Sequence, residues 1–176
     1  MTSWHDRAYR CVSLRWARPQ HLISGEGSRR FGSRWMRQAH TAASYAATTD
    51  FLALKEAKQT YGRFGIKKPI SSPRVLVELT LKLDRCLDLQ PLDGSGRLPS
   101  IDEMMSEDWE ATNKMGSEAL SQAIGRACFD LKFEGLIIPS ARDNRGRNIV
   151  WFPENLKRPD AVVISGEDEL KDWLNG

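Results

Sequence analysis

Alternation of apolar and polar residues predicts two strands in the first half of the chain. In residues 9–16 the even-numbered positions share one face, which places Arg10 among apolar neighbours. In residues 75–83 every odd-numbered position is valine or leucine, and glutamate, threonine and lysine stand between the last four of them. The second pattern is typical of a strand with one face on the core and the other towards solvent.

A hairpin is predicted in the C-terminal third of the chain. An apolar run at residues 136–139 ends at Ser140, and a second run covers residues 147–152. The turn-forming residues at 143–146 favour an antiparallel connection between the two runs. We therefore expect Ser140 and Arg142 near the open end of this hairpin.

A helix that carries a candidate acid is predicted between the first two strands. Thr49 or Asp50 can cap this helix, because a short polar side chain accepts hydrogen bonds from the free amides of a first turn. The helical pattern then runs to about Tyr61. Glu56 follows Leu52 by one turn, which places a carboxylate on or beside the buried stripe of the helix.

The remaining elements mix helix and strand without regular alternation. Residues 161–164 predict a last strand, and residues 168–174 predict a last short helix. Helical spacing within residues 109–133 predicts a further helix whose apolar positions are Leu120, Ile124, Ala127, Cys128 and Leu131. This irregular order favours an α+β fold, and we expect one domain over residues 1–176.

Two segments have the composition of loops. Residues 24–33 hold three glycines and two arginines, which is typical of a loop whose backbone approaches a ligand closely, and Arg34 and Trp35 follow it directly. Residues 88–107 are rich in proline, glycine and acids. We interpret this second segment as a long loop or lid.

Composition narrows the class of protein. The 26 basic and 23 acidic residues give a formal charge of +3, which is too small to indicate a nucleic-acid-binding protein by itself. The three cysteines are far apart and form no CxxC pair, so neither a disulfide framework nor a zinc site is predicted. Residues 1–10 contain no apolar run, and no stretch approaches the ~20 apolar residues of a membrane helix. We expect a cytoplasmic protein with reduced thiols and no metal.

An arginine cluster is the first candidate site. Guanidinium groups bind phosphate through paired hydrogen bonds, so the cluster suggests a pyrophosphate site. A solvated basic loop or an RNA-binding patch explains the same residues. The cluster consists of Arg29, Arg30, Arg34 and Arg37.

Glu56 and Ser140 are candidates of the same ambiguous kind. A half-buried carboxylate can be catalytic, but it can equally be an ordinary helix residue, and Ser140 can be a simple strand-end hydroxyl. The chain has no GxGxxG, GxxxxGK[ST] or HExxH motif, so the usual evidence for dinucleotide, P-loop and zinc-protease sites is missing.

Several short pieces, taken in order, resemble the RES-domain family, which is named for its arginine, glutamate and serine. The resemblance runs from about residue 9 to about residue 153, and its strength lies in the joint order of the pieces. The pieces are Tyr9-Arg10, Gly32-Ser33-Arg34-Trp35, Ala43-Ser44-Tyr45-Ala46-Ala47 with Leu52-Ala53-Leu54-Lys55-Glu56, Gly135-Leu136-Ile137-Ile138-Pro139-Ser140-Ala141-Arg142, and Arg147-Asn148.

The resemblance implies a fold related to ADP-ribosyltransferases, with a mixed sheet and flanking helices. It also implies an enzyme that degrades NAD as its substrate, without a separate cofactor. Such an enzyme is the toxin of a toxin–antitoxin pair, and its partner is an Xre-type helix-turn-helix antitoxin. Neither a membrane nor nucleic acid is an expected direct partner.

The resemblance also assigns residues. Arg34, Glu56 and Ser140 fall on the arginine, glutamate and serine of the family and are the predicted catalytic residues. The predicted NAD-binding residues are Arg10, Tyr45, Trp35 and Arg142. The chain departs from the family pattern at Met36, where a small polar residue is usual, and at Ala39, where glycine is common.

The acceptor of the ADP-ribosyl group stays open at this point. Water gives hydrolysis, phosphate gives phosphorolysis, and a macromolecule gives ADP-ribosyl transfer. The alternative from another class is a nucleic-acid-binding module, in which bases would stack on tryptophans beside the arginines.

Overall fold

The computed structural model describes residues 1–63, 73–92, 96, 99–140 and 143–176. For residues 58–63 and 143–145 it describes the backbone and not the side chains. The strands are β1 (Thr2–Ser13), β2 (Ser44–Ala47), β3 (Arg74–Asp88), β4 (Gly135–Ser140), β5 (Asp143–Trp151) and β6 (Val162–Ile164). The α-helices are α1 (Pro19–Ser24), α2 (Glu26–Phe31), α3 (Asp50–Arg63), α4 (Ile101–Ser106), α5 (Trp109–Lys114), α6 (Leu120–Asp130) and α7 (Glu167–Asn175). Short 3-10 helices are η1 (Leu14–Trp16), η2 (Gln90–Leu92) and η3 (Pro153–Asn155).

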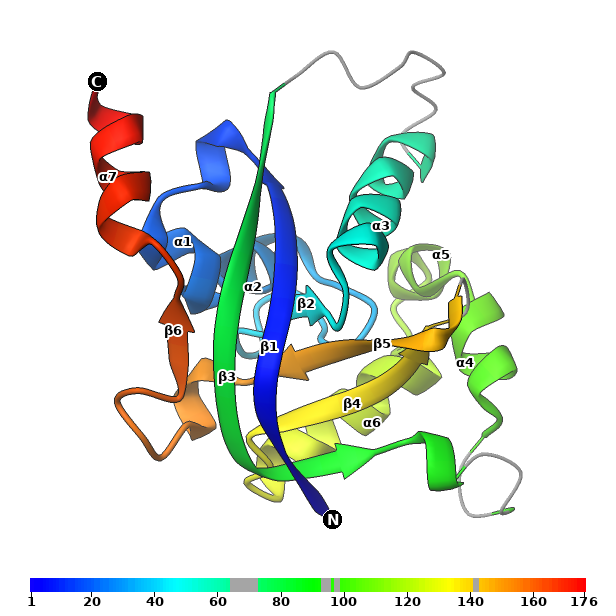
Figure 1. The fold of residues 1–176 in the computed structure, drawn as a ribbon. Coiled ribbons are helices and arrows are strands. Elements are labelled where there is room, and N and C mark those ends of the chain that lie inside the picture. Colours follow the sequence, from blue (N-terminus) through cyan, green and yellow to red (C-terminus); the bar gives the residue numbers. More distant parts are fainter. Residues whose placement is uncertain (64–72, 93–95, 97–98, 141–142) are drawn as a thin grey trace.

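The six strands form one mixed sheet in the order β1-β2-β5-β4-β3-β6, and an additional pairing of β1 with β3 turns the sheet back on itself. The β3–β4 pair is parallel and the others are antiparallel. Figure 1 shows β1 and β3 running together across β4 and β5. The predicted α+β class is therefore confirmed.

Two apolar cores lie on opposite faces of the central strands. The first is enclosed where the sheet turns back on itself, and includes Leu79 and Leu81 of β3 with Ile149 and Trp151 of β5. The second packs α4 and α6 against the other face of β4 and β5. Residues along β5 alternate between the two cores, since successive side chains of a strand point to opposite faces.

The strand predicted for residues 9–16 has other bounds in the structure. It begins earlier, at Thr2. Residues 2–7 are mostly polar, but their backbone forms hydrogen bonds with β3, and this pairing extends the strand. It ends at Ser13, and Leu14–Trp16 form the turn η1. This turn brings the Trp16 ring to 5.4 Å from the His21 ring, edge to face.

The loop predicted for residues 24–33 is mostly helical. Gly25 ends α1 with a left-handed φ of 65° and precedes α2 directly. A Cβ at Gly25 would lie 2.8 Å from the backbone of Ala43. The glycine therefore serves a junction between two helices that packs closely against Ala43.

The lid predicted for residues 88–107 contains regular structure as well. The 3-10 helix η2 and helix α4 both fall within it, and α4 begins with a capping box in which Ser100 and Glu103 bond each other's backbone amides. The interpretation of the whole segment as a loop is therefore wrong for Ile101–Ser106; residues 93–95 and 97–98 lie outside the described residues.

The segment 109–133 holds two helices, α5 and α6, and the second packs on β4 (Figure 1). A helix against the sheet is thus confirmed. Its predicted apolar stripe is wrong at Leu120 and Leu131, which are exposed by 45% and 62%, and at Ala127, which is also exposed, whereas Cys128 is buried. The residues that it buries instead are polar or small.

The hairpin of β4 and β5 is present, but its turn is not at residues 143–146. Asp143 already belongs to β5 and pairs with Ser140, and the pairing is irregular between this pair and Pro139–Arg147. Three other predictions are confirmed: β3, β6 with α7, and α3 with the Thr49 side chain accepting from the Leu52 amide at 3.1 Å. No helix in the described part of the chain is long and apolar enough to cross a membrane.

Candidate functional site

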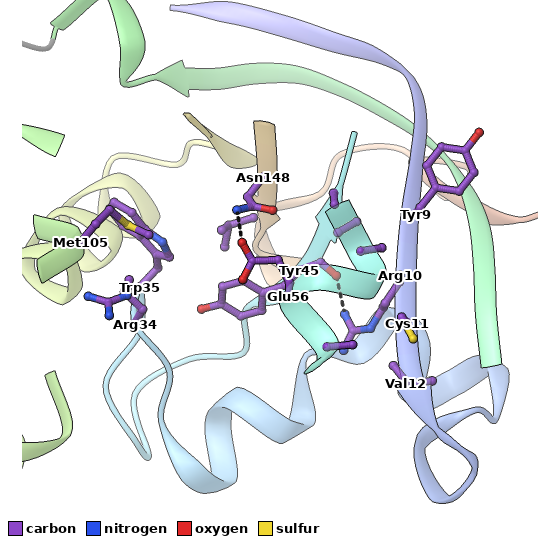
Figure 2. A pocket seen from close by; sticks show the side chains of 15 residues that line it. Tyr9, Arg10, Cys11, Val12, Arg34, Trp35, Tyr45, Glu56, Met105 and Asn148 are labelled. Carbon is purple, nitrogen blue, oxygen red and sulfur yellow. Dashed lines mark hydrogen bonds between the residues drawn. The ribbon is translucent and has the colours of Figure 1, made fainter. Parts of the chain in front are cut away.

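A cavity of about 350 Å³ lies where β1, β2, β5 and α3 meet the segment before β2. Five of the seven predicted site residues line it: Arg10, Arg34, Trp35, Tyr45 and Glu56. Figure 2 shows Glu56 and Tyr45 between Arg34 on one side and Arg10 on the other. Residues that are far apart in the chain thus share one cavity.

Glu56 owes its position to the packing of α3. Leu52, Ala53 and Ala57 are buried and fix which face of the helix turns inward, so that Glu56 is half-buried at the edge of that face. The Asn148 side chain donates a hydrogen bond to Glu56 Oε1 at 3.2 Å (Figure 2). The carboxylate is therefore oriented by an amide from β5.

Arg10 reaches the cavity from β1. Its Nη1 donates to the Ser44 hydroxyl. It also donates, at 3.1 Å, to the Tyr45 carbonyl oxygen (Figure 2). Burial lowers the pKa of Arg10 to about 10, so the guanidinium still carries its charge at neutral pH. Its Nε is buried and has no hydrogen-bond partner among the described residues. One donor of this half-buried cation thus lacks a partner among the described residues, which favours an acceptor supplied by a ligand.

Tyr45 stands on β2 beside these groups. Burial raises the pKa of Tyr45 to about 12, and its hydroxyl is hydrogen-bonded to the Ser33 hydroxyl. Ser33 Oγ also donates to the Met36 carbonyl oxygen at 3.2 Å, which leaves Tyr45 as the donor in the bond between the two hydroxyls. Tyr45 is therefore a neutral, fixed aromatic ring in the wall of the cavity.

Arg34 is held at the C-terminal end of α4. Its Nη1 donates to the carbonyl oxygens of Met104 and Glu107 at 2.9 and 3.1 Å. A cation is favourable there, because the last carbonyl groups of a helix are unpaired and carry partial negative charge. The segment interpreted as a lid thus fixes one of the predicted catalytic residues.

Trp35 lines the cavity but belongs mainly to the second core, with 4% of its surface exposed. Trp151 is fully buried in the first core. Neither ring is free to stack on a base, which counts against the nucleic-acid alternative.

Among the predicted site residues that the structure describes, Ser140 is not one of those that line the cavity. Ser140, at the end of β4, is 8% exposed. Ile138 pairs with Asn148, two residues before Ser140, and the pairing of β4 with β5 becomes irregular between Pro139 and Ser140. The role of Ser140 stays a prediction. Arg142 lies outside the described residues.

The other arginines of the predicted cluster do not reach the cavity. Arg29 and Arg30 flank Glu26 on α2, at 3.7 and 3.0 Å, and are exposed to solvent. Arg37 donates to the Gly116 carbonyl oxygen at 3.4 Å. These three arginines therefore lie on the solvated surface, and Arg34 is the member of the cluster that lines the cavity.

Asn148 is the main site residue that spacing and composition missed. It is part of the Arg147-Asn148 piece of the family pattern, but the pattern assigns no role to it, and its role follows from the contact with Glu56. The contact joins residues 92 positions apart. Met105 of α4 also lines the cavity.

A larger groove of about 1100 Å³ continues from the cavity and shares Arg10, Tyr45 and Glu56 with it. The groove extends past α2 to Trp109 and Lys114 of α5. Within the described residues no group of three or more His, Cys, Asp or Glu side chains could hold a metal ion. The site therefore offers one carboxylate, two cations and an aromatic ring in a partly enclosed space.

Comparison with known proteins gives a family and a fold. The sequence model of the RES domain matches residues 7–173. No curated protein matches the chain. Among solved structures, a chain in the crystal structure of the M. tuberculosis MbcT-MbcA toxin-antitoxin complex is similar, with a TM-score of 0.68 and 21% identity over 99% of this chain and 92% of that one.

Proposed function

This chain belongs to the RES-domain family, and from that premise we propose that it is the toxin of a toxin–antitoxin pair and degrades NAD by breaking the nicotinamide–ribose bond. The observation that carries the proposal is the single cavity in which Glu56 and Tyr45 lie between two arginines. NAD has the matching chemistry: an anionic pyrophosphate, an aromatic cation and ribose hydroxyls.

One carboxylate is enough for this reaction. The nicotinamide of NAD is a pyridinium, so it leaves as a neutral molecule and needs no acid to protonate it. An ordinary glycosidase needs two carboxyl groups, one of which supplies that proton. The cavity brings a single acid, Glu56, among its lining residues.

We assign Glu56 to the ribose that is losing its leaving group. Its carboxylate would accept a hydrogen bond from a ribose hydroxyl and stabilise the positive charge that develops on the ring. The Asn148 amide, 3.2 Å from Oε1, would hold the carboxylate in that orientation. Fixed charges at a partly enclosed site act without the reorganisation that water would need.

The two arginines would bind the pyrophosphate. Arg10 has a buried Nε without a partner among the described residues, which favours an anionic acceptor in the cavity. Arg34 would act from the opposite side. Tyr45 would stack on the nicotinamide or the bound ribose, and Ser140 would orient Glu56 or the nicotinamide amide.

For the partner we propose an antitoxin of the Xre type, which meets the toxin in the cytoplasm. The support is the family and the similarity of fold to a chain from a toxin–antitoxin complex. An antitoxin segment over the mouth of the cavity would block NAD. A complex that leaves the cavity open would contradict this part of the proposal.

Product analysis tests the reaction and its acceptor together. Purified protein is incubated with NAD, with and without inorganic phosphate, and the products are identified by mass spectrometry. Nicotinamide with ADP-ribose indicates hydrolysis, and a phosphorylated ADP-ribose that needs phosphate indicates phosphorolysis. Label from NAD on a protein or nucleotide in a cell extract indicates ADP-ribosyl transfer. Intact NAD with every acceptor, in a protein free of antitoxin, contradicts the proposed activity.

A further inference from the structure

The first half of helix α6 turns polar and small residues inward. Ser121 and Gln122 have no exposed surface and Gly125 is buried as well, whereas Leu120 is 45% exposed. Buried glutamine and exposed leucine on one helix reverse the usual preference. A reversal of this kind is expected where a local rule gives way to a functional requirement.

The inward residues contact three successive backbone carbonyl groups. Gln122 Nε2 donates to the Ser33 carbonyl oxygen at 2.9 Å, and Ser121 Oγ donates to that of Arg34 at 2.7 Å. Gly125 allows the closest approach, because a Cβ there would lie 1.8 Å from the Trp35 carbonyl oxygen. No apolar side chain could make these contacts.

Gln122 is itself fixed in place. Its side-chain amide and that of Asn113 exchange two hydrogen bonds, of 2.7 and 3.0 Å, and its oxygen also accepts from the Ala119 amide at 3.3 Å. Every donor of the Gln122 amide is thus used. A side chain locked by neighbours holds its partner more accurately than a mobile one.

The segment that α6 grips carries groups of the site. The Ser33 hydroxyl bonds the Tyr45 hydroxyl, and the Arg34 side chain reaches the carbonyl of Glu107. The Glu107 carboxylate in turn accepts from the Leu120 amide at 2.8 Å, at the start of α6. Both the backbone and the guanidinium of Arg34 are therefore tied to the same end of this helix.

We propose that Ser121 and Gln122 are positioning residues, which set the place of Arg34 in the cavity through the backbone of residues 33–35. The inference rests on the proposed function as far as the role of Arg34 in NAD binding is concerned. Neither side chain lines the cavity, and residues 33–35, two of whose carbonyl groups they contact, include Arg34 and Trp35 of its wall.

The kinetic test compares the two ends of α6. Ser121→Ala and Gln122→Met remove the contacts with residues 33 and 34. Asn155→Ala is the matched control, because Asn155 is also buried and its amide donates to the carbonyl oxygens of Phe129 and Phe133, at 2.9 and 2.8 Å, beside the other end of α6. All three variants lose side-chain contacts with backbone carbonyls.

We expect Ser121→Ala and Gln122→Met to raise the KM for NAD about tenfold, the effect of one lost hydrogen bond of about 1.4 kcal/mol, while kcat changes less than about twofold. Asn155→Ala should leave both constants unchanged. In an Arg34→Ala background Ser121→Ala should raise KM no further, because its effect passes through Arg34. An unchanged KM in both variants, or full additivity with Arg34→Ala, overturns the inference.

Hydrogen exchange gives a readout that needs no activity. The amides of Ser33 and Met36 bond each other's carbonyl oxygens, so the peptide over residues 32–37 should exchange faster in Ser121→Ala and Gln122→Met than in wild type or Asn155→Ala. Equal exchange in all four proteins overturns the inference. An inactive wild type with this exchange pattern contradicts the proposed function alone. Ser121→Ala removes a single oxygen, so it carries the test if Gln122→Met does not fold.

Discussion

Replacing Gly125 with alanine tests how closely α6 packs on the site. A Cβ at this position would lie 1.8 Å from the carbonyl oxygen of Trp35 and 2.9 Å from its carbonyl carbon. Both are backbone atoms, which cannot swing aside as the tip of a side chain can. The helix or the segment around Trp35 must therefore move.

The magnitude follows from two opposing effects. Alanine is favoured over glycine inside a helix by about 1 kcal/mol. Overpacking of a tight contact costs about 1–3 kcal/mol, and a backbone neighbour puts this site at the upper end. We expect Gly125→Ala to lower the free energy of unfolding by about 2 kcal/mol, which for a chain of this size lowers Tm by about 4–8 °C.

Gly27 provides the matched control. It also lies in a helix, α2, but a Cβ there would have nothing within 4 Å. Gly27→Ala should therefore keep or raise the stability of the wild type by up to about 1 kcal/mol. Thermal unfolding followed by circular dichroism compares the three proteins. A Gly125→Ala protein that melts together with Gly27→Ala would refute the direct packing of α6 on the Trp35 carbonyl.

Three further predictions concern other contacts. Asn148→Ala should lower kcat for NAD about tenfold with little change in Tm, because it frees the carboxylate of Glu56; steady-state kinetics beside a melting curve check this. Glu134→Ala should lower the free energy of unfolding, measured by urea denaturation, by about 3 kcal/mol. The wild-type carboxylate is fully buried and accepts hydrogen bonds from the amides of residues 84, 85 and 157, and a loss below about 1 kcal/mol would contradict this. Hydrogen bonds from Arg158 and His5 lower the pKa of Asp84. The ionised Asp84 side chain therefore stabilises the fold at pH values above the ordinary pKa of aspartate, and this stabilisation is lost as the pH falls through the lowered pKa. Urea unfolding between pH 6 and pH 3 should accordingly depend less on pH in Asp84→Asn than in wild type.

The elements that could be predicted are those whose pattern reflects their own burial. β3 alternates because one face lies on the core, and α3 has both a capping residue and a buried stripe. The polar first half of β1 gave no such signal, since its hydrogen bonds come from β3. The pattern identifies Ile124 and Cys128 of α6, which pack in the second core, but not Ser121, Gln122 and Gly125, because the partners of these residues are backbone carbonyls.

The residues of the site likewise fall into those that the sequence identifies and those that only the structure identifies. Periodicity alone left Glu56 and Ser140 as ambiguous candidates, and only the ordered pieces of the family pattern grouped Arg10, Tyr45 and Glu56. The structure adds the cavity that holds them and the contact of Asn148 with Glu56. Contacts between residues so far apart in the chain depend on the assembled sheet, so no local pattern could have revealed them.

The most direct test of the central claim is the behaviour of Glu56→Gln with NAD. Titration calorimetry measures NAD binding, and nicotinamide release measures turnover, with Glu169→Gln on the exposed face of α7 as the control. We expect Glu56→Gln to bind NAD about as tightly as wild type and to release nicotinamide about 100-fold more slowly, because the amide keeps the shape of the carboxylate without its charge. A Glu56→Gln protein that releases nicotinamide at the rate of wild type would contradict the account.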